Sequence, residues 1–94
     1  MRERDIEKYF ARRVKEAGGK SYKFTSPGHA GVPDRIVLFP GRVLFAEIKT
    51  EGGKLSPLQA IVHAEMRALG AIVFVIWSKA DVDVFIEGVE NDLI

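Results

Sequence analysis

The sequence predicts an α/β fold in which helices flank a mixed central sheet, in the order αβββαβ with a further helix at the C-terminal end. Apolar residues recur at helical spacing over 3–17 and 57–69. Two apolar runs, 35–39 and 42–49, are separated by a Pro-Gly turn, which predicts a hairpin. The almost wholly apolar run 71–77 is typical of a strand covered on both faces.

The first helix is predicted over residues 3–17, and Gly18-Gly19 ends it. Residues 20–24 then form a short strand candidate. The stretch 26–33 is rich in Ser, Pro and Gly, which predicts a loop before the hairpin. The inward-facing positions of the helix, spaced by four, four and three residues, are Ile6, Phe10, Val14 and Ala17.

The second helix is predicted to start at Pro57, with Ser56 as its N-cap and Gly70 as its stop. Ser78, with Asp81 three residues later, resembles a further helix start. The helical spacing of Val82, Phe85, Ile86 and Val89 favours a helix there, although Val82 and Val84 alternate as in a strand. The residues expected to face inward from the second helix are Leu58, Ile61, Val62, Met66 and Leu69.

Length and composition indicate a single globular domain over residues 1–94, with 47% hydrophobic residues. No apolar stretch approaches the roughly 20 residues of a membrane span, and the N-terminus lacks the apolar core of a signal peptide. With no cysteine, disulfides and thiolate metal sites are excluded, which is consistent with a reducing cytosolic setting. Residues 1–24 hold eight basic and four acidic groups, a net charge of +4 that suits a phosphate backbone or a solvated helix.

Charged side chains stand at the ends of two apolar strands. Asp34 leads into the first, while Glu47 and Lys49 close the second and project to the same side, opposite Ile48. Two carboxylates bind a hard cation such as Mg²⁺, a main-chain carbonyl adds an oxygen ligand, and an ammonium suits phosphate or an attacking water. Each residue taken singly also fits an ordinary turn or surface role, but the ordered set favours a site for phosphodiester hydrolysis.

Three motifs resemble the VRR-NUC form of the PD-(D/E)xK nuclease signature. They are Gly31-Val32-Pro33-Asp34, Glu47-Ile48-Lys49, and the segment 53–59 with the sequence Gly-Lys-Leu-Ser-Pro-Leu-Gln. The resemblance extends from the first helix through the strand ending at Trp77. It implies a restriction-endonuclease-like core that cleaves DNA with Mg²⁺ or Mn²⁺, as a stand-alone homodimer similar to Holliday junction resolvases.

The resemblance also implies a role for each matching position. Asp34 and Glu47 match the metal-binding carboxylates, together with the Ile48 carbonyl, and Lys49 matches the catalytic lysine. Gln59 matches the glutamine that supports the site, yet it also stands where it would complete a capping box with Ser56. The remaining match is the acidic residue of the first helix, which binds metal directly or through water; it falls on Glu7, while the helical wheel alone does not separate Glu7 from Glu3.

Lys23, Ser26 and Lys54 are candidate contacts to the DNA backbone because they lie in or beside glycine-rich and polar loops. His29 is expected in a loop and His63 on the helix surface. With no third His and no Cys, a zinc site is not predicted. Trp77 is expected in the core or an interface. The chain has no nucleotide-binding glycine loop.

Four functions remain open. The first is a dimer that cuts four-way junctions symmetrically, which requires two sites related by a two-fold axis; the apolar last strand and helix are its candidate interface. The second is a monomeric nuclease that acts on flaps or ends. The third is a DNA-binding module on the same fold without catalysis, although the presence of Asp34, Glu47 and Lys49 argues against it. The fourth is a protein-interaction domain, which would show no salt-dependent DNA affinity.

Overall fold

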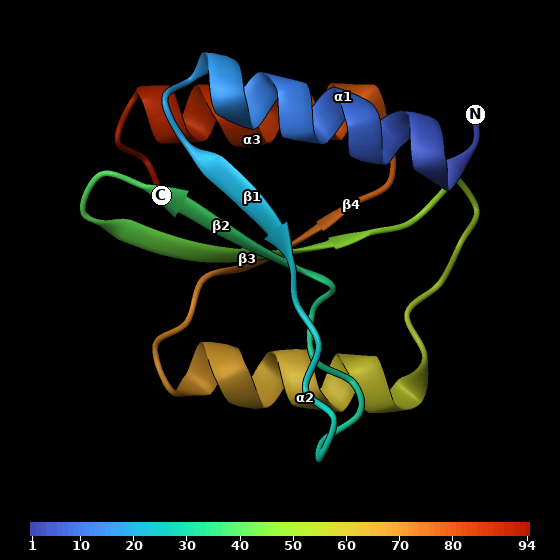
Figure 1. Ribbon diagram of the computed structural model, residues 1–94. Coiled ribbons are helices and arrows are strands. Elements are labelled where there is room, and N and C mark those ends of the chain that lie inside the picture. The colour runs from blue at the N-terminus through green and yellow to red at the C-terminus, as the bar shows by residue number, and fades with distance from the viewer.

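The computed structural model describes residues 1–94 and contains three helices and four strands, in the order αβββαβα that the sequence predicts (Figure 1). The predicted boundaries hold to within two residues, and the last strand starts two residues later than predicted. The elements are α1 (Glu3–Glu16), β1 (Lys20–Lys23), β2 (Arg35–Phe39), β3 (Arg42–Ile48), α2 (Pro57–Ala68), β4 (Val73–Ile76) and α3 (Lys79–Glu90).

The four strands form one mixed sheet in the order β1-β2-β3-β4. β1 pairs with β2 and β2 with β3 in antiparallel fashion, whereas β3 and β4 are parallel. The β2–β3 hairpin turns at Gly41, whose φ of 75° lies in the left-handed region that glycine adopts without strain. A parallel neighbour needs a crossover, and α2 provides it between β3 and β4.

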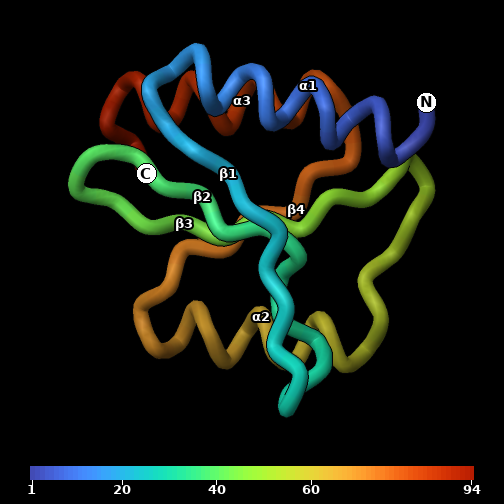
Figure 2. The backbone as a smooth tube through the Cα atoms, in the orientation of Figure 1, coloured from blue at the N-terminus to red at the C-terminus, as the bar shows by residue number.

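Helices cover both faces of the sheet: α1 and α3 lie side by side on one face and α2 lies on the other (Figures 1 and 2). The main core fills the space beneath α1 and α3. There Ile6, Phe10 and Val14 of α1 are fully buried, as their spacing predicts. Phe10 and Phe74 both pack against Phe85 of α3, with ring centroids 5.3 and 5.1 Å apart. Burial of each large apolar side chain contributes about 1.5–3 kcal/mol to this packing.

The C-terminal segment that the sequence left open between helix and strand is the helix α3. Ser78 caps it by accepting a hydrogen bond from the Asp81 main-chain nitrogen at 3.1 Å. Val82 and Val89 are buried against the core, whereas Val84 is 68% exposed. A strand would place Val82 and Val84 on one face, so the burial pattern has the period of a helix.

The predicted inner face of α2 is wrong for Leu58, Ile61 and Leu69 and confirmed for Val62 and Met66. Leu58 and Ile61 are about half exposed and Leu69 is 90% exposed, whereas Val62 is buried. His63, which the sequence placed on the surface, is fully buried. The face that α2 turns toward the sheet is made by Gln59, Val62, His63 and Met66. Apolar periodicity failed here because α2 covers buried charged groups and therefore presents polar side chains inward.

The strand β4 forms one edge of the sheet, and Trp77, which directly follows it, contacts the loop between β3 and α2. The indole nitrogen of Trp77 donates to the Gly53 carbonyl at 2.9 Å, which anchors the loop between β3 and α2. Trp77 is therefore partly buried, which is consistent with the expected place in the core or an interface. None of the helices combines the length and the apolar character that crossing a membrane requires.

Candidate active site

The loop before β2 is held so that Asp34 stands directly beside the end of β3. The Phe24 main-chain nitrogen donates to the Asp34 carbonyl at 2.8 Å, which extends the β1–β2 ladder by one pair. On the other side, the Ile48 main-chain nitrogen donates to Asp34 Oδ1 at 3.3 Å. These two contacts hold the carboxylate of Asp34 beside the strand that carries Glu47.

Gly31 lets α2 approach this loop closely. Its φ is +95°, and a Cβ at this position would lie 2.8 Å from Val62 Cγ2 and 3.1 Å from the Leu58 main-chain oxygen. Any other residue would be strained and would push α2 away. The next residues include Pro33, which is fully buried. The Gly-Val-Pro-Asp motif therefore brings the loop, α2 and Asp34 together.

The end of β3 places Glu47 and Lys49 on the α2 side of the sheet, while Ile48 faces the core under α1 and α3. Glu47 is only 4% exposed. The Lys49 ammonium lies 3.8 Å from Glu47 Oε2 and keeps about a fifth of its side chain exposed. The alternation of a strand thus brings this acid and this base together, with the lysine nearer to solvent.

Burial and neighbouring acids raise the pKa of both carboxylates. Desolvation raises the pKa of Asp34 to about 6, opposed chiefly by the hydrogen bond from Ile48. Desolvation, followed by the charge of Asp34, raises the pKa of Glu47 to about 7, while Lys49 lowers it. Near neutral pH the pair therefore carries negative charge that the protein neutralises only in part, which is the condition that a divalent cation relieves.

Gln59, on the first turn of α2, reaches the same oxygen of Glu47 that Lys49 approaches. Its Nε2 donates to Glu47 Oε2 at 3.4 Å. The same side chain completes a capping box: Gln59 Oε1 accepts from the Ser56 main-chain nitrogen at 2.9 Å, and the Gln59 main-chain nitrogen donates to Ser56 Oγ at 3.1 Å. Both contacts that the sequence left as alternatives occur together.

Glu7 lies at the rim of the site and is engaged by an arginine. Arg35 Nη2 lies 3.3 Å from Glu7 Oε2, and both side chains are largely buried. Glu7 and Glu3 both add to the negative field on Asp34, and the contribution of Glu7 is the larger. The structure gathers no group of three or more His, Asp or Glu side chains that could hold a cation, so Glu7 does not join the other two acids as a third ligand in this arrangement.

Two residues at this site escaped the sequence-based expectations. The sequence patterns assign no role to Arg35, although it directly follows Asp34 in the chain. His63 was placed on the surface, yet its Nε2 lies 3.9 Å from Glu47 Oε1. The signal was its spacing of four residues from Gln59, which puts both side chains on one face of α2. Both nitrogens of His63 and the Oε1 atom of Glu47 are buried without a hydrogen-bond partner, a state that costs about 1–3 kcal/mol for each group.

A hollow of about 170 Å³ opens beside Asp34, and of the three predicted DNA contacts only Lys23 lines it. Ser26 accepts a hydrogen bond from the His29 main-chain nitrogen in its loop, and Lys54 is exposed on the loop that Trp77 anchors. The complete lining of the hollow is Glu7, Lys23, Phe24, Thr25, Asp34 and Arg35.

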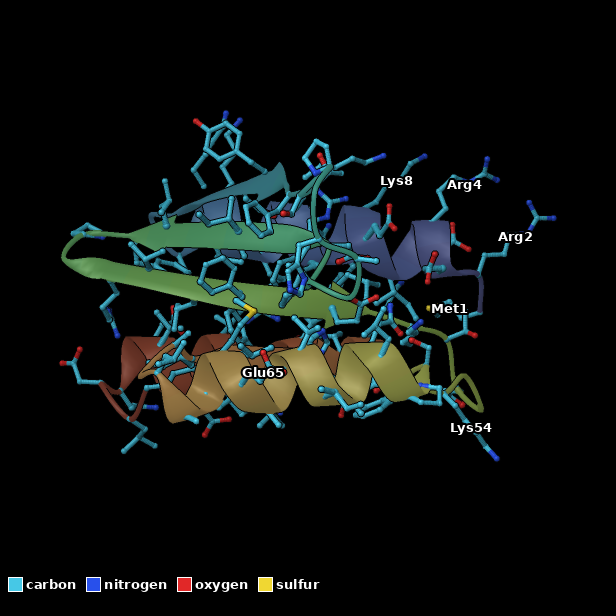
Figure 3. All side chains as sticks on the ribbon, turned by 90° about the horizontal axis from the view of Figure 1, so that it is seen from below. Met1, Arg2, Arg4, Lys8, Lys54 and Glu65 are labelled. Atoms are coloured by element: carbon cyan, nitrogen blue, oxygen red, sulfur yellow. The ribbon has the colours of Figure 1, made fainter.

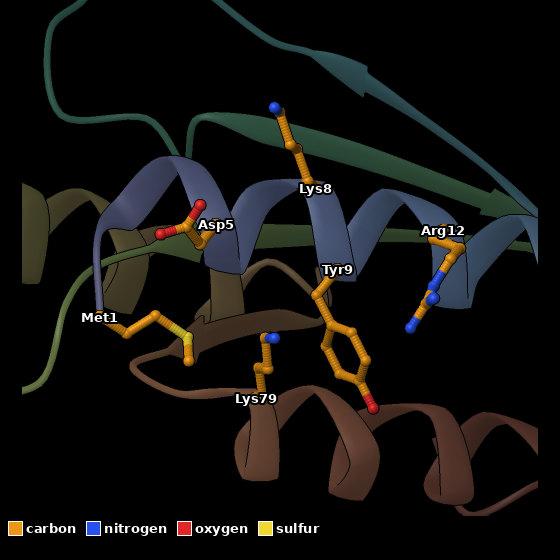
Figure 4. Close-up of a pocket in the computed structure, with 6 residues that line it drawn as sticks. All are labelled: Met1, Asp5, Lys8, Tyr9, Arg12 and Lys79. Atoms are coloured by element: carbon orange, nitrogen blue, oxygen red, sulfur yellow. The ribbon is translucent and has the colours of Figure 1, made fainter.

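The largest hollow, of about 400 Å³, lies elsewhere, between the outer faces of α1 and α3 (Figure 4). Lys79 approaches to 5.2 Å from the centroid of the Tyr9 ring, and Arg12 lies at the same distance from it. This groove contains none of the site residues, so its size does not mark it as the place of the chemistry. Its lining residues are Met1, Asp5, Lys8, Tyr9, Arg12 and Lys79.

Comparisons with known proteins agree with this geometry. No protein-family model matches the chain. The chain is 46% identical over 80 residues to a protein named "Putative nuclease p44" from Acyrthosiphon pisum secondary endosymbiont phage 1, over 84% of this chain and 86% of that protein. A solved structure described as a VRR_NUC domain superposes on it with a TM-score of 0.85 at 38% sequence identity, over 90% of this chain and 94% of that one. Likeness of this extent, in sequence and in fold, confirms the resemblance, and the chain belongs to the VRR_NUC domain family.

Proposed function

We propose that this chain is a Mg²⁺-dependent DNA endonuclease that hydrolyses phosphodiester bonds in branched DNA, four-way junctions in particular, as a homodimer. Mn²⁺ would substitute for Mg²⁺, and the enzyme would act in the cytoplasm of a bacterial or phage-infected cell. One observation carries the proposal. The Asp34 carboxylate is held beside the end of β3, where Glu47 is buried and the Lys49 ammonium lies next to Glu47. The phage relative whose name describes a nuclease supports the same reaction class.

The donor set fits a divalent cation. Asp34 and Glu47 would hold it with the main-chain carbonyl of Ile48, and Glu7 would act through a water. Burial raises the pKa of both acids, and a bound cation would favour their charged forms in this setting. Mg²⁺ keeps several waters and needs only one or two protein carboxylates, so two acids are sufficient. When bound, the cation would stabilise the charge that builds on the phosphate and favour ionisation of the attacking water.

The side chains of the protein supply the remaining requirements. Lys49 lies beside Glu47 and closer to solvent, where its ammonium can hold the attacking water and donate to a phosphate oxygen. Gln59 holds Glu47 from the α2 side. Arg35 neutralises Glu7 and so limits the negative charge that a DNA phosphate would meet at the rim of the hollow.

Basic side chains gather at the end of the molecule where α1 begins. Figure 3 shows Arg2, Arg4, Lys8 and Lys54 extending from this end. It is also the end at which β3 finishes and β2 starts, and therefore the end that carries the site (Figure 1). Contacts to phosphate from these residues would hold DNA without reading its bases. Lys23 would contribute next to Asp34, with Ser26 and Lys54 farther out.

The dimer would form through the β4 edge and α3. A hollow of about 340 Å³ with a mostly apolar lining lies there, between Phe74, Val84, Leu93 and their neighbours. Val84 and Leu93 are 68% and 75% exposed, although both are large apolar residues. Exposed apolar side chains beside an unpaired strand edge favour association with a second copy.

The decisive experiment compares labelled four-way junction, flap and plain duplex DNA with Mg²⁺, Mn²⁺ or EDTA, using the wild-type chain and Lys49→Ala. We expect paired symmetric nicks in the junction that both EDTA and the substitution abolish. Mass determination in solution on the same samples would show whether the active species is a dimer.

Three other outcomes would replace the proposal. Cleavage confined to flaps or ends by a monomer would establish the monomeric nuclease. Salt-dependent DNA binding by a folded chain that cuts no substrate would establish a non-catalytic binding module. A folded chain without salt-dependent affinity for DNA would leave a protein-interaction domain.

A further inference from the structure

His63 is the most deeply buried polar side chain in the molecule that makes no hydrogen bond. Its exposure is zero, and neither ring nitrogen has a partner. It lies on α2 one turn after Gln59, so both side chains point to the same place on the sheet. That place is the carboxylate of Glu47.

Gln59 and His63 face different oxygens of the Glu47 carboxylate. Gln59 donates to Oε2, whereas His63 Nε2 faces Oε1 at 3.9 Å. Oε1 is itself buried and has no partner. A donor and an acceptor that both lack partners, and that face each other within 1 Å of bonding distance, form a contact that a small shift of the Glu47 side chain completes.

The chemistry of His63 suits a neutral donor. A neutral imidazole carries one N–H, which can donate to a carboxylate without adding a positive charge next to a cation. Partners of this kind orient metal-binding groups in many proteins, and removing one typically weakens metal affinity 10- to 100-fold.

We propose that His63 is a positioning residue for Glu47: its Nε2–H donates to Glu47 Oε1 when the carboxylate holds a divalent cation, and this bond fixes the orientation of the carboxylate. The inference rests on the proposed metal site. It adds to that site a residue outside the matched motifs, and it explains why the inner face of α2 carries a histidine in place of an apolar residue.

The test is Mn²⁺ binding to the full chain after EDTA treatment, measured by the electron paramagnetic resonance of free Mn²⁺. His63→Gln can still place a nitrogen donor near the position of Nε2, whereas His63→Asn is one methylene shorter and His63→Leu has no donor. We expect about 10-fold weaker Mn²⁺ binding for the Asn and Leu variants, and binding within about three-fold of wild type for Gln.

Val89→Ala serves as the matched control for stability, because Val89 is equally buried but lies on α3, across the sheet from Glu47. It should lower the melting temperature and leave Mn²⁺ affinity unchanged. If His63→Leu does not fold, the comparison of Asn with Gln decides the outcome. Unchanged affinity in the Asn variant, or equal losses in Asn and Gln, would overturn the positioning role.

The same data separate this inference from the function on which it rests. A wild-type chain that binds no Mn²⁺ at millimolar concentration contradicts the metal site, and the role of His63 is overturned with it. A wild-type chain that binds Mn²⁺ and cuts DNA, together with His63 variants that bind equally well, overturns the positioning role alone.

Discussion

Gln59 Nε2 lies 3.4 Å from Glu47 Oε2, and through this contact the N-terminal cap of α2 is joined to the pair of acids at the end of β3. The two polar atoms of the Gln59 amide have different partners: Oε1 accepts a hydrogen bond from the Ser56 main-chain nitrogen, while Nε2 donates to the Glu47 carboxylate. The position of α2 and the orientation of Glu47 are therefore coupled through one side chain.

Substitutions at Ser56 and Gln59 should separate the cap from the site. Ser56→Ala removes the cap bond and should cost about 1 kcal/mol of stability with little effect on Mn²⁺ affinity or cleavage. Gln59→Glu keeps an acceptor for the cap but replaces the donor with a negative charge facing Glu47. We expect it to keep most of the stability and to lose DNA cleavage at least 10-fold, as measured by melting curves and single-turnover assays. Full cleavage by Gln59→Glu would contradict a role for this residue in the site.

Lys49→Ala should reduce cleavage by roughly 10²–10⁴-fold because it removes the only ammonium beside Glu47. The fold and the affinity for Mn²⁺ should change little, because a cation holds Glu47 ionised in place of the lysine. The matched control is Lys54→Ala, which removes an exposed lysine from the following loop. Comparable losses in both variants, measured at saturating DNA, would show that Lys49 acts only through general charge.

Stability in EDTA should fall as the pH rises from about 5 to 8. The folded-state pKa values of Asp34 and Glu47 are raised, so the folded protein binds protons more tightly than the unfolded chain in this range. The stabilisation is therefore complete below pH 4 and is lost as the pH passes through about 6 and about 7. The contribution of Glu47 alone has an upper limit of about 3 kcal/mol, or roughly 10–20 °C in melting temperature, and that of Asp34 adds to it in the same direction.

Glu47→Gln is the control for this pH dependence, because it removes one of the two titrating groups. Its melting temperature should vary much less between pH 5 and 8. Added Mn²⁺ should stabilise the wild-type chain increasingly as the pH rises, since binding releases protons. A melting temperature that increases with pH in EDTA would be incompatible with the raised pKa values.

Lys23 and Lys20 offer a test of the DNA path within one short strand. Lys23 lines the hollow beside Asp34, whereas Lys20 pairs with Leu38 at the far end of β1. We expect Lys23→Ala to weaken junction binding in EDTA and to reduce the slope of affinity against salt by about one. Lys20→Ala should change neither quantity appreciably. Equal effects from the two lysines would indicate diffuse attraction in place of a defined path.

Charge placed at the proposed interface should break the dimer. Val84 is exposed on α3 beside the β4 edge, and Ile61 is comparably exposed on α2, on the other face of the sheet. Val84→Glu should yield monomers in analytical ultracentrifugation and remove paired nicking, while Ile61→Glu should remain dimeric. The reverse result would move the interface to α2, and monomers for the wild-type chain would contradict dimerisation.

The order of elements follows from local signals in the sequence. The apolar stripe of α1 predicted its buried residues Ile6, Phe10 and Val14, since a helix with one apolar face turns that face toward the sheet. The hairpin at Gly41 and the cap at Ser56 likewise depend on residues that are neighbours in the chain. The same is true of Glu47 and Lys49, which strand alternation brings to one side.

The sequence by itself therefore determined the fold class, the positions of its helices and strands, and the acid–lysine pair of β3. Only the tertiary structure decided which face α2 buries, the pairing of Arg35 with Glu7, and the place of His63 behind Glu47. These relationships join residues 16 to 28 positions apart in the chain, beyond the reach of helical or strand periodicity. Burying the Glu47 carboxylate without polar neighbours would be unfavourable. The inward positions of α2 near it are therefore occupied by Gln59 and His63, while Leu58 and Ile61 remain exposed.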